Sequence, residues 1–96
     1  MTVYVVALIN ISDRAGYQRY GDGFMEIFDR YQGQLLAVDE SPTVIEGEWP
    51  HTRTVLLSFP SAEAMKAWYG SPEYQALAQH RLNASTAQVA MVNALS

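Results

Sequence analysis

The sequence predicts an α+β fold of the ferredoxin-like type, a four-stranded antiparallel sheet with its helices on one face. Two observations lead to this prediction. The 96 residues alternate extended apolar segments with amphipathic helical segments in the order β-α-β-β-α-β. Both alternating sets of side chains in the first and last strands are apolar, which indicates a sheet covered on both faces. Repeats and linkers are absent from the sequence, so we expect a single domain over residues 1–96.

The middle of the chain carries the clearest boundaries. Residues 53–59 are β-branched and aliphatic, and Pro60 ends that strand. Ser61 is a good helix N-cap, because its hydroxyl accepts a hydrogen bond from an otherwise unpaired backbone N–H. Gly70 ends the helix, and Ser71 with the proline that follows it begins another. We therefore expect a second helical region that is broken at Gly70.

A longer amphipathic helix follows the first strand, residues 2–11, and is expected to run to Gly33. Gly21 and Gly23 interrupt it at a cost of about 1 kcal/mol each relative to alanine. We therefore expect a kink, a break or a close contact there. Apolar and aromatic side chains recur along this helix at spacings of three and four: Tyr17, Tyr20, Phe24, Ile27, Phe28 and Tyr31.

Between the two helical regions we expect a short strand at residues 34–38, an extended stretch at 43–46 and a loop at 47–52. If residues 43–46 form a hairpin with the central strand, Glu46 and Arg53 face one another across it. One interpretation is a structural salt bridge that fixes the hairpin. The other is a guanidinium that holds an acidic ligand.

One face of the predicted sheet has no cover within the chain, because two helical regions can cover only one face. Tyr4, Val6 and Leu8 lie on the other face, and exposing them with their neighbours would create a large apolar patch. The charged fraction of 17% is also below the roughly 25% usual for soluble domains. We therefore expect an obligate homodimer in which two sheets pack face to face as a dimeric α/β barrel.

Composition argues against several classes of partner and site. The net charge is −4 without a Lys/Arg cluster, so nucleic acid is not an expected partner. The chain has no cysteine, and its two histidines are far apart, so neither a metal site nor a cofactor is expected. The longest apolar run, residues 5–9, is far shorter than the ~20 residues that span a bilayer. We expect no membrane association and a cytoplasmic location.

Several short runs form a recognisable pattern along nearly the whole chain: Glu46-Gly47, Arg53, Phe59-Pro60-Ser61, Ala67-Trp68-Tyr69, Ser71, Glu73-Tyr74-Gln75 and Arg81. This pattern resembles the domain-of-unknown-function 1330 family, which has no agreed activity. The resemblance implies the dimeric α/β-barrel superfamily, whose members include small monooxygenases, lactone isomerases, and haem-degrading and haem-peroxidase enzymes. Haem is not expected here, because neither histidine lies in a suitable pocket context. Gln32-Gly33 stands where the family commonly has Gly-Gly.

Two functional hypotheses follow, and they differ in what the cleft between sheet and helices holds: a small molecule, or only side chains. The first is a cofactor-free enzyme, monooxygenase-like or isomerase-like, that acts on an aromatic or acidic molecule. Its proton-transfer and anion-holding groups would be Tyr17, His80 and Arg53. The alternative is a non-catalytic binding or structural homodimer.

The remaining candidates for ligand binding are mostly aromatic: Tyr20, Glu46, Trp68, Tyr69 and Tyr74. Each candidate also has a plainer interpretation. The aromatic rings can be core residues that fix helix to sheet, and His80 can be an exposed helix residue. Six tyrosines against three phenylalanines is, however, rich in hydroxyls for a dry core, which favours a polar-lined cleft.

Overall fold

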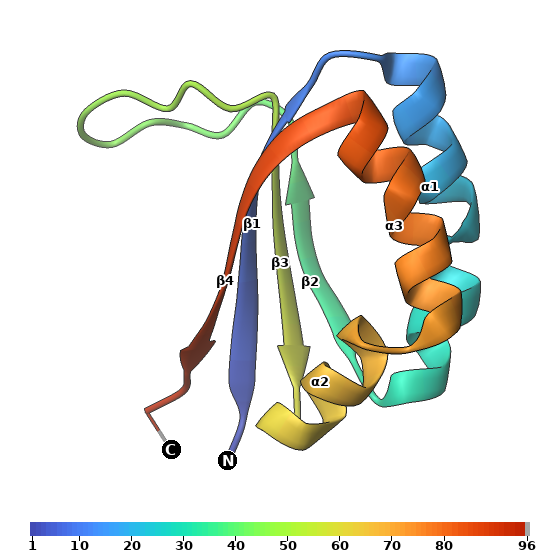
Figure 1. Cartoon of the computed structure of the whole chain (residues 1–96). Coiled ribbons are helices and arrows are strands. Elements are labelled where there is room, and N and C mark those ends of the chain that lie inside the picture. The colour runs from blue at the N-terminus through green and yellow to red at the C-terminus, as the bar shows by residue number, and fades with distance from the viewer. Residues whose placement is uncertain (96) are drawn as a thin grey trace.

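The computed structural model describes residues 1–95 and contains the predicted strands and helical regions (Figure 1). In chain order they are β1 (Val3–Ile11), α1 (Arg14–Phe28), the short 3-10 turn η1 (Asp29–Tyr31), β2 (Gln34–Asp39), β3 (Arg53–Phe59), α2 (Ala62–Tyr69), α3 (Pro72–Ala84) and β4 (Ser85–Asn93). The break at Gly70 is confirmed. The Ser71 hydroxyl accepts from the Tyr74 N–H at 3.2 Å and donates to the Trp68 carbonyl at 2.8 Å, joining α3 to α2.

The strands form one antiparallel sheet in the order β2-β3-β1-β4. β1 lies in the interior of the sheet, and its Val5 is opposite Leu57 of β3 on one side and Met91 of β4 on the other. The helices gather on one face of this sheet, and no helix of residues 1–95 covers the other (Figure 1). The ferredoxin-like α+β prediction is therefore confirmed.

The core lies between the sheet and the helices. The inward side chains Val3, Val5 and Ile9 of β1 are buried there, as the alternation of the strand predicts. At the end of the sheet where β1 begins and β3 ends, Phe28 of α1 and Phe59 of β3 pack edge to face with centroids 5.5 Å apart. These contacts fix the distance between the two layers.

Helix α1 runs without a break through both interior glycines, and a close contact explains one of them. A Cβ atom on Gly23 would lie 2.8 Å from Cδ1 of Leu77, so glycine allows α3 to approach α1. The helix ends at Phe28, earlier than predicted. The chain then turns through η1 and through Gln32, which adopts a left-handed backbone with φ 65°.

The predicted pair of Glu46 and Arg53 is wrong. The strand before the loop continues to Asp39, and residues 43–46 do not form an extended partner for β3. Because Asp39 is opposite Thr54 in the register, the next residue, Glu40, reaches Arg53. The Arg53 Nη1 atom lies 3.1 Å from Oε2 of Glu40, whereas Glu46 is exposed in the loop.

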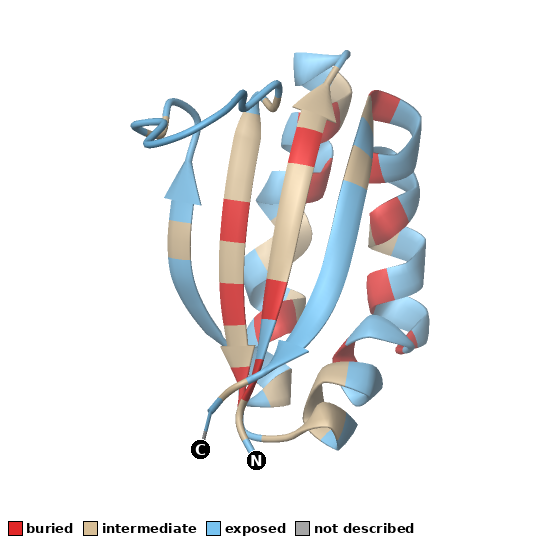
Figure 2. Cartoon of the chain, turned by 90° about the vertical axis from the view of Figure 1, so that its left-hand side faces the viewer, coloured by how far each residue is buried: buried red, intermediate tan, exposed pale blue. Residues whose placement is uncertain are grey.

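The helix-free face of the sheet is largely apolar. Tyr4 and Val92 are 38% and 45% exposed there, and Val6, Leu8 and Leu56 are half-buried. Figure 2 looks onto this helix-free face. The buried bands that it shows on β1 and β3 are residues whose side chains point away from the viewer, toward the helices. The loop between β2 and β3 projects beyond the sheet on this same side (Figure 1). No helix in the described part of the chain is long and apolar enough to cross a membrane.

Candidate functional site in a cavity between sheet and helices

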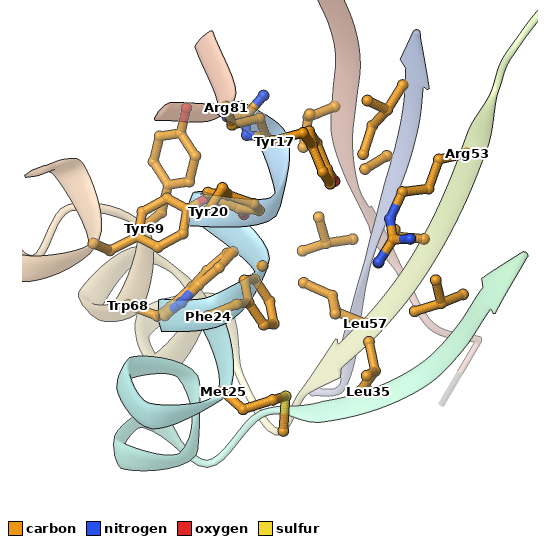
Figure 3. Close-up of a pocket in the computed structure, with 18 residues that line it drawn as sticks. Tyr17, Tyr20, Phe24, Met25, Leu35, Arg53, Leu57, Trp68, Tyr69 and Arg81 are labelled. Atoms are coloured by element: carbon orange, nitrogen blue, oxygen red, sulfur yellow. The ribbon is translucent and has the colours of Figure 1, made fainter. Parts of the chain in front are cut away.

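A cavity of about 160 Å³ lies between the sheet and the helices (Figure 3). The sheet contributes mainly aliphatic side chains, and the helices contribute mainly aromatic rings. The residues that line it are Val5, Ala7, Ile9, Tyr17, Tyr20, Gly21, Phe24, Met25, Leu35, Val38, Arg53, Val55, Leu57, Trp68, Tyr69, Tyr74, Arg81 and Val89. A flat molecule would thus meet an aliphatic wall on one side and an aromatic wall on the other.

Tyr17 and Tyr20 are brought to the cavity by α1. They are one helical turn apart, each is 7% exposed, and their ring centroids are 5.5 Å apart. Burial raises the pKa of Tyr17, while the positive charges of Arg53 and Arg81 act in the opposite direction. The Tyr17 phenol is therefore neutral at pH 7 and faces two cationic side chains.

A hydrogen bond between two buried phenols joins α1 to α3 at the cavity wall. The hydroxyl oxygens of Tyr20 and Tyr74 are 2.8 Å apart. Burial raises the pKa of both groups, and for Tyr20 the neighbouring Tyr74 adds to the effect. Both phenols therefore stay protonated at neutral pH. Since the pair has two hydroxyl hydrogens and uses one in this bond, the second is free to donate.

Arg53, the first residue of β3, reaches toward the cavity from the sheet (Figure 3). Its guanidinium carbon lies 5.5 Å from the centroid of the Tyr17 ring. Its Nη1 donates to Glu40, whereas its Nε is buried without a hydrogen-bond partner among residues 1–95. Arg53 is therefore anchored at one edge and retains an unused donor.

Glu40 links Arg53 to the start of α1. Its two carboxylate oxygens accept from Nη1 of Arg14 at 3.0 and 2.9 Å, and one of them also accepts from Arg53. The hydrogen bonds from Arg14 and then Arg53 lower the pKa of Glu40 below its usual 4.5. This carboxylate is ionised at neutral pH and balances part of the charge of Arg53.

Arg81 also lines the cavity and was not predicted as a site residue. It is 6% exposed, and its guanidinium carbon lies 5.7 Å from the centroid of the Tyr20 ring. No ion pair joins it to a carboxylate within the described residues. A signal was available in the sequence: Arg81 continues the buried stripe of Tyr74 and Ala78 on α3, where a charged side chain is unusual.

Trp68 and Tyr69 come from the last turn of α2. Trp68 is buried and packs against Tyr74 with centroids 4.3 Å apart, and its indole N–H has no partner in the described chain. Tyr69 also lines the cavity and is partly exposed. Trp68 is thus both a core residue and a wall of the cavity.

Two of the predicted site residues lie outside this cavity. His80 is exposed on α3, and Glu46 is exposed in the loop. The lining therefore contains neither a histidine nor a carboxylate. What the cavity offers is a mainly apolar slot with neutral hydroxyls and two guanidinium groups, which is suited to holding an oxyanion. No cluster of three or more His, Cys, Asp or Glu side chains with metal-binding geometry occurs in residues 1–95.

Comparison with known proteins agrees with this fold. A family model described as "Domain of unknown function (DUF1330)" matches residues 2–95. No curated protein matches the chain in sequence. A crystal structure of a protein of unknown function from Rhodopseudomonas palustris is similar with a TM-score of 0.81 and 16% identity, covering 99% of this chain and 83% of that chain.

Two further solved structures share the fold at low identity. The cofactor-independent oxygenase SnoaB from Streptomyces nogalater has a TM-score of 0.70 and 13% identity, with 99% of this chain and 94% of that chain covered. A dimeric ferredoxin-like protein of unknown function from Jannaschia sp. CCS1 has a TM-score of 0.70 and 14% identity, with 98% and 100% covered. At these identities the likeness extends to the fold alone.

Proposed function

The chain belongs to the DUF1330 family, and from that premise we propose that it is a homodimeric protein that binds a small, mainly apolar anion between sheet and helices. The composition of the cavity lining carries the proposal. Arg53 and Arg81 are the only charged side chains among the lining residues of the described chain, and both are cationic. The remaining lining is apolar or consists of neutral phenols.

The size of the cavity limits the ligand. Its volume is about 160 Å³, close to the roughly 150 Å³ of an apolar cavity that holds one benzene molecule. The slot between an aliphatic sheet and aromatic helices favours a planar group. A single-ring carboxylate or phenolate meets both conditions, and a longer molecule would extend past Tyr69 or Met25 into solvent.

Cofactor-independent catalysis is a second candidate, favoured by the donors that face the slot. Neutral hydroxyls and guanidinium groups stabilise negative charge that develops on a substrate oxygen. The lining has no group that accepts a proton near pH 7, so such an enzyme would act on a substrate that is already an oxyanion. SnoaB, a cofactor-independent oxygenase with this fold, makes oxygen uptake the reaction to test first.

The homodimer is proposed through the helix-free face of the sheet. Tyr4, Val6 and Val92 would be covered by the same face of a second copy, which removes an apolar patch from water. The loop on this side adds Val44 and Ile45, the latter 86% exposed. The ferredoxin-like structure from Jannaschia is described as dimeric, which supports the same arrangement here.

Ligand binding is tested with benzoate as the probe and Trp68 as the reporter. The chain has two tryptophans, so Trp49→Phe in the exposed loop leaves Trp68 as the sole indole. We expect a saturable change in its fluorescence. Ala7→Phe fills the slot and should abolish the change, whereas Ala76→Phe, at an exposed position of α3, should preserve it.

The proposal fails if no single-ring anion changes Trp68 fluorescence at millimolar concentration, or if Ala7→Phe binds as well as the parent protein. Catalysis is tested separately with an oxygen electrode and a single-ring phenolate. We expect oxygen uptake that depends on the protein and is lost in Ala7→Phe. Saturable binding without uptake would leave the binding function and remove the oxygenase candidate.

A further inference from the structure

The two guanidinium groups of the cavity come from opposite walls and differ in their neighbours. Arg53 reaches in from β3, and Arg81 lies on α3 beside Tyr17 and Tyr20 (Figure 3). Arg53 has an ionic partner, because its Nη1 lies 3.1 Å from Glu40. Glu40 also binds Arg14, whose side chain is 63% exposed and therefore well hydrated. The charge at the Arg53 end is thus partly compensated before any ligand arrives.

Arg81 has no such compensation. It is more deeply buried than Arg53, and no carboxylate lies within 4.0 Å of it among the described residues. Its surroundings are phenols that stay neutral at pH 7: Tyr20, Tyr74 and Tyr17. The face of Tyr20 and the C-terminal end of α3 offset part of its charge. They do not replace a counter-ion, and a buried unpaired charge is costly to a folded protein.

We propose that Arg81, together with the hydroxyl pair of Tyr20 and Tyr74, holds the anionic group of the ligand, and that Arg53 contacts its neutral part. This inference rests on the proposed binding function. The phenol pair has one hydroxyl hydrogen left after its mutual bond, so it donates to an oxyanion beside the guanidinium. At the other end, the unpartnered Nε of Arg53 is matched to a neutral acceptor such as a carbonyl or hydroxyl oxygen.

The ligand class follows from this assignment. It is a single-ring molecule with one carboxylate or phenolate oxygen directed at α3 and a neutral oxygen directed at β3. A dianion is disfavoured, because the second charge would lie beside Arg53, where Glu40 is already bound. Hydroxybenzoates in the monoanionic form have the required pattern.

Benzoate and benzamide test the assignment, because they have nearly the same shape and differ in charge. Binding is measured by Trp68 fluorescence in the Trp49→Phe background. We expect that protein to bind benzoate at least tenfold more tightly than benzamide. Arg81→Met should remove this preference by weakening benzoate alone, and Arg81→Lys should keep part of it. Arg53→Met should weaken both probes by a similar factor and leave the ratio unchanged.

The folding of each variant is followed by near-ultraviolet circular dichroism and thermal unfolding without ligand. Arg81→Met should be at least as stable as the parent, because a buried unpaired cation is replaced by an apolar side chain of similar length. If Arg81→Met does not fold, Arg81→Lys replaces it as the test variant. The benzoate to benzamide ratio of the parent and of Arg81→Lys still measures charge selectivity in that case.

The outcomes separate the inference from the proposed function. Equal affinity for benzoate and benzamide overturns the role of Arg81 while ligand binding stands. A preference that survives in Arg81→Met and disappears in Arg53→Met assigns the anion to Arg53 and also overturns it. Failure of both probes to bind the parent protein overturns the proposed function itself.

Discussion

The hydroxyl oxygens of Tyr20 and Tyr74 lie 2.8 Å apart, and this hydrogen bond joins the first helix to the last inside the wall of the cavity. Both rings are buried, so each hydroxyl takes its partner from the other helix and not from water. The bond belongs equally to the packing of α1 on α3 and to the proposed anion site.

The first prediction concerns alkaline pH. Burial raises the folded pKa of Tyr20 above its usual 10. The protonated phenol makes its full contribution to the free energy of unfolding below pH 10. This contribution is lost as the pH rises above 10, because in that range only the unfolded chain releases the phenol proton. Urea unfolding should show a decreasing free energy of unfolding above pH 10. Tyr20→Phe should reduce that slope by up to about 1.4 kcal/mol per pH unit. Equal slopes in the two proteins would contradict a raised pKa.

The second prediction compares two glycine substitutions. A Cβ atom on Gly33 would lie 2.6 Å from Cε1 of Phe28 and 2.8 Å from Cε1 of Phe59, both in the core. Gly33→Ala should therefore destabilise the protein by about 1–3 kcal/mol. Gly21 is exposed in α1 with only Gln18 near such an atom, so Gly21→Ala should be neutral or stabilise by up to about 1 kcal/mol. Urea unfolding measures both, and a tolerated Gly33→Ala would be evidence against this core packing.

The third prediction concerns the homodimer. Val6→Asp places a charge in the middle of the helix-free face, and we expect the folded dimer to be lost. Leu82→Asp is the matched control, because Leu82 is exposed on α3, and α3 lies on the opposite face of the sheet. It should sediment as the wild type does. A folded wild-type monomer in sedimentation velocity at low micromolar concentration would disprove the dimer.

The fourth prediction concerns Glu40. Hydrogen bonds from Arg14 and Arg53 lower its folded pKa below 4.5. Its contribution to stability is therefore complete above that pH and is lost as pH falls through the folded pKa. Glu40→Gln should lower the free energy of unfolding by less than about 1 kcal/mol at pH 7, since Glu40 is exposed in both of its ion pairs. The difference from wild type should shrink toward pH 3.

A loop residue provides the control for that measurement. Glu46 makes no ion pair within residues 1–95, so Glu46→Gln should change the free energy of unfolding by less than about 0.5 kcal/mol at pH 7. Equal effects of the two substitutions would mean that the contacts of Glu40 with Arg14 and Arg53 contribute nothing measurable.

Local chemistry was enough to predict most element boundaries. Ser71 and Pro72 mark the start of α3 by their own capping and ring geometry, wherever that helix packs. The predicted end of α1 at Gly33 is too late, because the helix ends at Phe28 and the chain then turns through η1 and the left-handed Gln32. The loop after Asp39 was misread as partly extended, and the error carried over to Glu46. Loops have no periodic pattern, so their register with a strand cannot be read from spacing.

The candidate site was predicted in part. The rings of Tyr17, Tyr20, Trp68, Tyr69 and Tyr74 line the cavity, as does Arg53, and an excess of tyrosine on helix faces was the signal that identified several of them. Their roles in binding stay predictions. His80 was predicted because imidazole is the usual group for proton transfer near pH 7, a criterion of chemistry and not of position.

The sequence by itself determined the order of the elements, the apolar faces of the strands and the excess of hydroxyl-bearing rings, because these depend on neighbours within a few residues. Only the tertiary structure decided which side chains meet in the cavity. Successive residues on a helix point about 100° apart, so the packing of α3 against α1 turns Arg81 inward and leaves His80 in solvent. That rotation is set by contacts such as Gly23 with Leu77, between residues far apart in the chain.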